Sequence, residues 1–226
     1  MARNTVGTFF PDRVNLHFKN AKYAADVDHG GAGKIGLGPA SWLPAAQSNG
    51  IIAAASIATA VSITSFATTY KAEKSMGRFG RNVTLALSGA GTPAATVFGL
   101  DYLGQPMQET FNLAGATPVV GKKAFGSVTR VDCALVAATT LNVGWGDILG
   151  LPYKLIDVYT ELVDGAEATV AGTFVIGQNA AQTSTSNDPR GTWTPGAGFL
   201  ANGAKNYALY GLFDSDNLYG NAHFNG

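Results

Sequence analysis

Residues 82–125, NVTLALSGAGTPAATVFGLDYLGQPMQETFNLAGATPVVGKKAF, decide the fold of this chain. Short runs that alternate between apolar and polar residues are interrupted there by turns rich in Gly, Pro and Asp, about every eight to twelve residues. This spacing is typical of an all-β domain, because alternation turns one side of each strand toward a core. The stretch carries no nucleophile–base pair and no cluster of metal ligands, which favours a structural or binding protein over an enzyme.

Similar runs on both sides of this stretch extend the β pattern. Together with the stretch itself, which predicts strands at 83–88, 95–102 and 108–113, they predict strands at 57–66, 127–136, 154–162, 168–176 and Tyr207–Phe213. Sequential strands with short turns favour an antiparallel β-sandwich or a jelly-roll-like domain over a parallel sheet. We therefore expect three parts: an extended N-terminal arm over residues 1–50, a main β domain over 51–176, and a polar linker with an aromatic-rich C-terminal extension over 177–226. The extension is expected to pack on the β domain or on a neighbour.

Composition indicates a surface that neighbours cover. Only 13% of the 226 residues are charged and 29 are glycine, whereas about a quarter of an average soluble domain is charged. The net charge of zero combines +5 over residues 1–81 with −5 over residues 82–226. Such asymmetry suits an N-terminal arm that docks on an acidic face of another copy or another protein. Alternatively, the two halves neutralise each other within one fold.

The sequence indicates a protein made in a reducing compartment and not inserted in a membrane. A single cysteine, Cys133, cannot form an internal disulfide. The N-terminal residues lack a continuous apolar stretch typical of a secretory signal. Ile51–Phe66 is long, apolar and uncharged like a membrane span. Its small and β-branched residues, interspersed with Ser and Thr, predict a buried strand instead.

Several motifs suggest ligand sites without meeting their requirements. Gly31–Gly36 satisfies G-x-G-x-x-G, but it neither follows a buried strand nor opens a helix, as a dinucleotide site requires. Asp214–Asn217 begins like a calcium loop, but Leu218 stands where a third ligand is needed. The histidines lie far apart in the sequence: His17, His29 and His223. We expect a flexible arm, a solvated turn, and no cofactor, metal or catalytic residue.

Two pairs of carboxylates resemble the acids of a glycosidase only loosely. Glycosidases place two acids across a cleft, and Asp101 with Glu109, or Asp157 with Glu161, are such pairs in sequence. Spacing of this kind is common in β proteins. We predict turn capping for Asp101 and solvent exposure for Glu109 and Glu161.

Lys71–Arg81 is the densest basic segment, with four cations beside an aromatic residue. Charge together with stacking can bind single-stranded nucleic acid. The segment is short and the rest of the chain is neutral to acidic, so attraction to polyanions is weak. Pairing with an acidic neighbouring protein is favoured, and no nucleic-acid partner is expected.

Several strings resemble recurring elements of tailed-bacteriophage head proteins, specifically capsid decoration or cement proteins. They are GLDYLGQPMQET at 99–110, FNLAG at 111–115, VGKKAF at 120–125, VTRV at 128–131, VGWGDILGLP at 143–152 and DPRGTWTP at 188–195. The resemblance extends over about residues 82–196. It implies a structural virion protein, made in the host bacterial cytoplasm, that binds the outer capsid surface and bridges subunits of the major capsid protein. It also implies a homo-oligomer, a dimer or a trimer at a symmetry axis.

Aromatic and basic residues are the expected interface contacts, since such residues dominate interface energetics. The candidates are Arg3, Phe9, Phe10 and Arg13 in the arm, Lys71, Lys74, Arg78, Phe79 and Arg81 in the basic segment, and Trp193, Phe199 and Tyr210 near the C-terminus. The C-terminal aromatics could instead form a core. Two other functions stay open: another virion component (tail, connector or fibre base), and a carbohydrate-binding or hydrolytic β-sandwich.

Overall fold

The computed structural model describes residues 32–134, 136–214 and 216–221. This part of the chain is built almost entirely of antiparallel strands, which confirms the predicted all-β class. Its elements are β1 (Ala32–Gly36), the 3₁₀ helix η1 (Ala40–Trp42), β2 (Gln47–Ser56), β3 (Val61–Ile63), α2 (Ala72–Ser75), β4 (Arg81–Leu87), β5 (Ala94–Leu100), β6 (Pro106–Asn112), β7 (Val119–Val120), β8 (Ser127–Cys133), β9 (Thr140–Gly150), β10 (Leu155–Val163), β11 (Ala166–Glu167), β12 (Thr173–Ile176), β13 (Gly191–Thr194) and β14 (Tyr207–Phe213).

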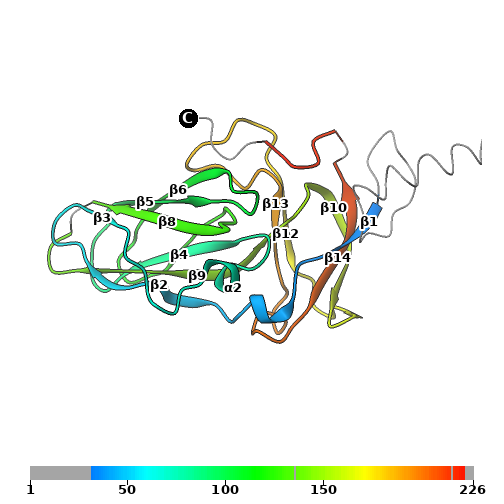
Figure 1. Cartoon of the computed structure of the whole chain (residues 1–226), viewed down its shortest axis with the longest axis horizontal. Helices are drawn as coiled ribbons and strands as arrows, with labels where there is room; N and C mark the ends of the chain where they lie inside the picture. The colour runs from blue at the N-terminus through cyan, green and yellow to red at the C-terminus, as the bar shows by residue number, and fades with distance from the viewer. Residues whose placement is uncertain (1–31, 135, 215, 222–226) are drawn as a thin grey trace, which may run out of the picture.

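Strands β2 to β9 form a jelly roll. Their antiparallel pairs are nested, because β2 pairs with β9, β3 with β8, β4 with β7 and β5 with β6. One layer holds β2, β9, β4 and β7 and the other holds β3, β8, β5 and β6; the two layers lie one above the other in the left half of Figure 1. Eight strands arranged in two such layers are the architecture of a jelly roll. The predicted sandwich is confirmed, in its jelly-roll form.

Alternating apolar residues fill the space between these two layers. In β5 and β6 every second residue is buried. Leu85 of β4 and Val143 of β9 are direct cross-strand partners, and both are fully buried. Each such side chain contributes about 1.5–3 kcal/mol when it is removed from water. Burial of these apolar side chains therefore contributes a large part of the free energy that holds the two layers of the jelly roll together.

A second β unit with its own core adjoins the jelly roll. A four-stranded sheet in the order β1-β14-β10-β11 lies on the right of Figure 1, beside β12 and β13. Its buried residues include Ile35, Trp193, Leu209 and Phe213. Strand β9 joins the two units, because its first half pairs with β2 and its last two residues pair with β13.

The structure differs from the expected three-part organisation. Residues 32–50 are not an arm: β1 pairs with β14, and β2 begins at Gln47. Ile35, Leu37 and Leu43 are buried, so this glycine-rich segment is tied down by hydrophobic packing. The jelly roll occupies residues 47–150 instead of 51–176, because β10 and β12 belong to the second unit. The arm predicted for residues 1–31 lies outside the described residues.

The segment that resembles a membrane span is two strands. The prediction of one strand over 57–66 is wrong, because β2 ends at Ser56 and β3 begins at Val61. Ile57 in the turn between them is fully buried. In the described part of the chain, no helix has the length and apolar character needed to cross a bilayer.

Candidate interaction surfaces

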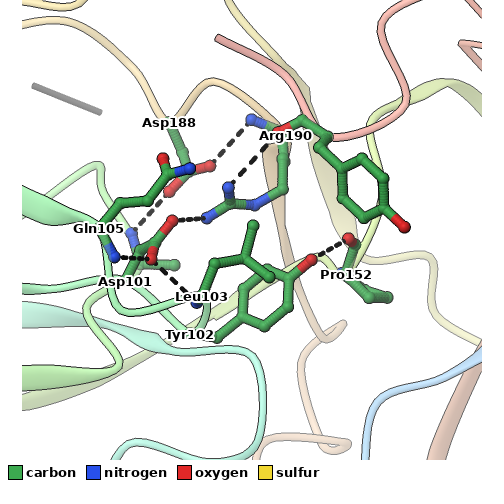
Figure 2. Close-up of polar contacts among 9 residues, drawn as sticks. Asp101, Tyr102, Leu103, Gln105, Pro152, Asp188 and Arg190 are labelled. Carbon is green, nitrogen blue, oxygen red and sulfur yellow. Dashed lines mark hydrogen bonds and ion pairs between the residues drawn. The ribbon is translucent and has the colours of Figure 1, made fainter. Parts of the chain in front are cut away.

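A buried ion pair lies where the jelly roll meets the second unit (Figure 2). Arg190, just before β13, donates from Nη2 to Oδ2 of Asp101 at 3.0 Å. Only 2% of Arg190 and 4% of Asp101 are exposed. The other carboxylate oxygen of Asp101 accepts the backbone N–H groups of Leu103 and Gln105 at 2.9 and 2.8 Å. The predicted turn-capping role of Asp101 is confirmed, and the same carboxylate also joins the two units.

Asp188 and Tyr102 complete this polar cluster (Figure 2). Asp188 accepts the N–H of Ala124 at 3.1 Å with one oxygen and the N–H of Arg190 at 3.0 Å with the other. The Arg190 guanidinium lies 4.7 Å from the centroid of the Tyr102 ring. The Tyr102 hydroxyl donates to the carbonyl of Pro152, and burial raises its pKa to about 12, so it stays a donor at neutral pH. The cluster therefore connects segments from both units.

The polar linker predicted after residue 176 is held against the jelly roll. We call residues 177–190 the connecting segment. Nζ of Lys123, a buried lysine, donates to the carbonyl of Thr183 at 2.6 Å, and the N–H of Thr110 on β6 donates to the carbonyl of Ser184 at 2.8 Å. Near its start, Asn179 accepts from the buried Lys154, which also pairs with Asp214 at 2.6 Å. These contacts give the segment a structural role, because they fasten it to strands of both units.

The predicted exposure of two carboxylates is wrong. Glu109 is buried and accepts the N–H groups of Lys122 at 2.6 Å and Lys123 at 3.3 Å. Burial raises its pKa to about 7, because the backbone donors and the lysines offset desolvation only in part. Glu161 accepts from Nε1 of Trp193 at 2.9 Å. Both carboxylates satisfy donors inside the protein, which a strand position by itself does not reveal.

The raised pKa of Glu109 makes stability depend on pH. The pKa of Glu109 is about 7 in the folded protein, against an ordinary value of 4.5. Between these two pH values the folded protein keeps the proton, whereas the unfolded chain has largely released it. The stabilisation is therefore present below pH 4.5 and is lost as pH rises through 7. Relative to Glu109→Gln, the wild-type free energy of unfolding should fall by up to about 3 kcal/mol over this range. Urea unfolding at a series of pH values measures the difference, and parallel curves for the two proteins would contradict the prediction.

Two of the predicted partner contacts are instead buried within the chain. Arg81 is fully buried and donates to the carbonyls of Gly146 at 2.8 Å and Pro44 at 2.7 Å. Desolvation lowers its pKa to about 10, with Asp147 opposing the shift. Trp193 is also fully buried and packs edge-on against Tyr207 in the second core. Neither side chain can contact a partner in this structure, so the interface prediction is corrected for both.

The other predicted contacts are spread over several places. Lys71, Lys74 and Arg78 are exposed around α2. Phe79 and Phe199 are half-buried, with Arg78 over the first ring and Lys205 over the second. The four arm candidates lie outside the described residues: Arg3, Phe9, Phe10 and Arg13. Tyr210 lies on an apolar sheet face described next.

Strands β1, β14 and β10 present an apolar face directed away from the second core. On β14, Tyr207, Leu209 and Phe213 are buried in that core, so the alternate residues Tyr210 and Leu212 lie on the opposite side. The register adds the cross-strand partners of these two residues, which are Ala32 and Lys34 on β1 and Asp157 and Thr160 on β10. We call this surface the outer face.

Two irregularities in β10 add exposed apolar side chains at this face. The register shifts between Leu155 and Asp157 and again between Val158 and Thr160. The residues at these shifts, Ile156 and Tyr159, are 40% and 57% exposed. Exposed apolar side chains gathered on one sheet mark an interaction surface. Of this surface the sequence prediction included only Tyr210, although Tyr207–Phe213 is apolar on both sides, as in a strand covered on both faces.

The outward side of the β3-β8-β5-β6 layer is more polar. Arg130 on β8 lies 4.0 Å from the ring centroid of Phe98 and 3.2 Å from Asp132. The hydroxyl of Ser62 on β3 donates to the same Asp132 at 2.6 Å. These polar side chains satisfy one another and cover the one aromatic ring among them. The outer face of the second unit is therefore the stronger candidate for a protein contact.

Comparison with known proteins assigns no family and no function to these surfaces. No protein-family model, curated protein or solved structure matches the chain. Within residues 32–134, 136–214 and 216–221, no three His, Cys, Asp or Glu side chains are grouped so that they could hold a metal ion. The three histidines lie outside these residues.

Proposed function

We propose that this chain is a structural virion protein that binds the outer surface of a tailed-phage capsid and bridges subunits of the major capsid protein. The observation that carries the proposal is the apolar outer face, built from Tyr210, Leu212, Ile156 and Tyr159 on a chain with little surface charge. Exposed apolar side chains gathered on one face are typical of a surface that another protein covers. The proposal thus assigns the chain to a protein assembly.

Three further features support a role in a shell. The jelly roll is widely used by viral capsid proteins, although lectins and cupins share it, so the fold by itself does not select a function. The buried cluster around Arg190 holds the two units together, as a protein that must resist outward pressure requires. The exposed cations Lys71, Lys74 and Arg78 are suited to an acidic patch on the capsid, where they would steer and orient binding.

Copy number in purified particles tests this proposal. Quantitative mass spectrometry of the phage that encodes the chain should give a ratio to the major capsid protein of about one, or a simple fraction of one, because decoration follows shell symmetry. A few dozen copies or fewer would assign the chain to the tail, connector or fibre base. Complete absence from particles would reject the virion role and favour the carbohydrate-binding alternative.

A charge-reversal pair then tests the contact surface. Particles that lack the chain are incubated with Lys74→Glu or with the matched variant Lys122→Glu, which reverses an exposed lysine on the jelly roll. Lys74→Glu should bind about threefold or more weakly, with the deficit largest at low salt. Equal binding of the two variants would exclude the basic segment as the capsid contact.

A further inference from the structure

The outer face carries one cation and one anion on opposite flanks of an apolar centre. Lys34 on β1 and Thr160 on β10 both pair with Tyr210, while Asp157 on β10 pairs with Leu212. Lys34 also lies over the Tyr210 ring, with Nζ 5.5 Å from the centroid. The strand β14 between the flanks contributes Tyr210 and Leu212. The charged groups therefore border the apolar centre, as rim residues do in protein interfaces.

We propose that a second copy of this chain covers the outer face, so that two sheets pack face to face about a two-fold axis parallel to β14. This operation places β1 of each copy over β10 of the other. Lys34 of one copy then approaches Asp157 of the second, and the reverse contact forms by symmetry, as an isologous interface requires. The inference assigns the outer face to a second copy and leaves the exposed cations Lys71, Lys74 and Arg78 free to contact the capsid. Its test uses the isolated protein, so it can fail without the virion assignment failing.

The strand register makes this pairing feasible. Lys34 is level with Tyr210 and Asp157 is level with Leu212, so the charges are offset by two residues, roughly 7 Å along the strand. The long side chain of lysine can bridge such an offset, and the two-fold axis makes the two Lys34–Asp157 contacts equivalent. Tyr159 and Ile156, exposed at the irregular positions of β10, supply apolar area for the contact.

The surface charge favours a copy of the chain over a strongly charged partner. The face has one lysine, Lys34, and one aspartate, Asp157. The other residues that the register places on it are uncharged: Ala32, Gly36, Thr160, Leu162, Ala208, Tyr210 and Leu212. A partner of high positive or negative charge would meet a like charge on one flank whichever way it docked. An identical face turned about the two-fold axis meets opposite charges on both flanks, so it is complementary to itself.

Sedimentation of the full chain over a range of concentrations tests the interface. The wild-type protein should show a monomer–dimer equilibrium, and Tyr159→Asp should raise the dimer Kd by about tenfold or more, since it buries a charge in the apolar centre. The matched control is Val120→Asp on β7, where Val120 is 54% exposed on the jelly roll. It should leave the Kd unchanged. Thermal unfolding of each variant checks that it is folded.

Charge exchange provides a second, independent measurement. Lys34→Glu and Asp157→Lys should each raise the dimer Kd about threefold to tenfold. The double variant should have a Kd within about threefold of the wild-type value. The proposal is overturned if the wild type stays monomeric to its solubility limit, if it forms a trimer, if Tyr159→Asp and Val120→Asp behave alike, or if the double variant is as weak as the single ones.

Discussion

Replacing Arg190 by Met should lower the free energy of unfolding by about 3–5 kcal/mol, the loss typical when one member of a buried ion pair is removed. The variant keeps a side chain of similar length against the Tyr102 ring, but it removes the guanidinium that lies 3.0 Å from Asp101. Asp101 would then lose its hydrogen bond to the guanidinium in a buried position. Its two backbone donors, Leu103 and Gln105, compensate that loss only in part. Denaturant unfolding monitored by tryptophan fluorescence measures the loss.

The structure offers a matched control for this prediction. Arg130 pairs with Asp132 at 3.2 Å, but their side chains are 44% and 40% exposed. Arg130→Met should therefore cost less than about 1 kcal/mol. Adding Asp101→Asn to Arg190→Met should restore part of the stability, because the buried charge is removed while the turn-capping oxygen remains. Equal losses for Arg190→Met and Arg130→Met would show that the buried pair does not hold the two units together.

Replacing Gly144 by Ala should disrupt the pairing of β2 with β9. A Cβ at this position would lie 1.7 Å from the carbonyl oxygen of Gln47. The Cβ and the carbonyl oxygen are both fixed to strand backbone, so neither can move aside unless a strand of the sheet moves with it. We expect a loss of at least about 3 kcal/mol, at the upper end of over-packing effects. Thermal unfolding and hydrogen exchange of the β2 amides measure it, and exchange should rise in β2 before it rises in β14.

Gly36→Ala is the matched control. Gly36 also lies in a strand, but an added Cβ there meets nothing within 4 Å. This substitution should be neutral or stabilising by up to about 1 kcal/mol, because alanine restricts the unfolded chain. If both variants unfold like wild type, the close approach of Gln47 to β9 is absent in solution.

The alternation of apolar and polar residues predicts those strands that have one face on a core and the other face outside it. The run Tyr207–Phe213 predicts a strand, and β14 has the same bounds. The predicted runs 83–88, 95–102 and 108–113 correspond closely to β4, β5 and β6. Each of these strands has one side on a core, so the period of two is visible in the residues themselves.

The longest strand, β9, is not predicted because glycines interrupt its pattern. Gly144, Gly146 and Gly150 lie where an added Cβ would approach Gln47, Asn82 and Phe79 to within 2.6 Å or less. Glycine weakens a strand by itself and marks a close approach of another segment. Which segment approaches is a property of the folded chain. Strand β1 is also not predicted, because its glycines break the alternation and favour an arm, although an added Cβ at Gly36 would meet nothing within 4 Å.

The candidate interface residues and carboxylates show the same difference between what the local sequence predicts and what the fold decides. The sequence indicates that Arg81 and Trp193 make strong contacts, but it cannot distinguish a partner protein from the chain's own interior. For Glu109 it predicts solvent exposure, which is wrong. Distant backbone carbonyls and amides decide this: Arg81 donates to Pro44 and Gly146, and Glu109 accepts from Lys122 and Lys123. A buried charge is stable only where such groups converge.

The all-β class, the alternating strands and the low charge are therefore determined by the sequence alone, since they depend on composition and on the two-residue period of a strand. The nested order of the jelly roll, the burial of Arg81, Arg190 and Glu109, and the apolar outer face are decided only by the tertiary structure. The physical reason is that burial and hydrogen bonding depend on which distant segments meet, and local residue patterns do not carry that information.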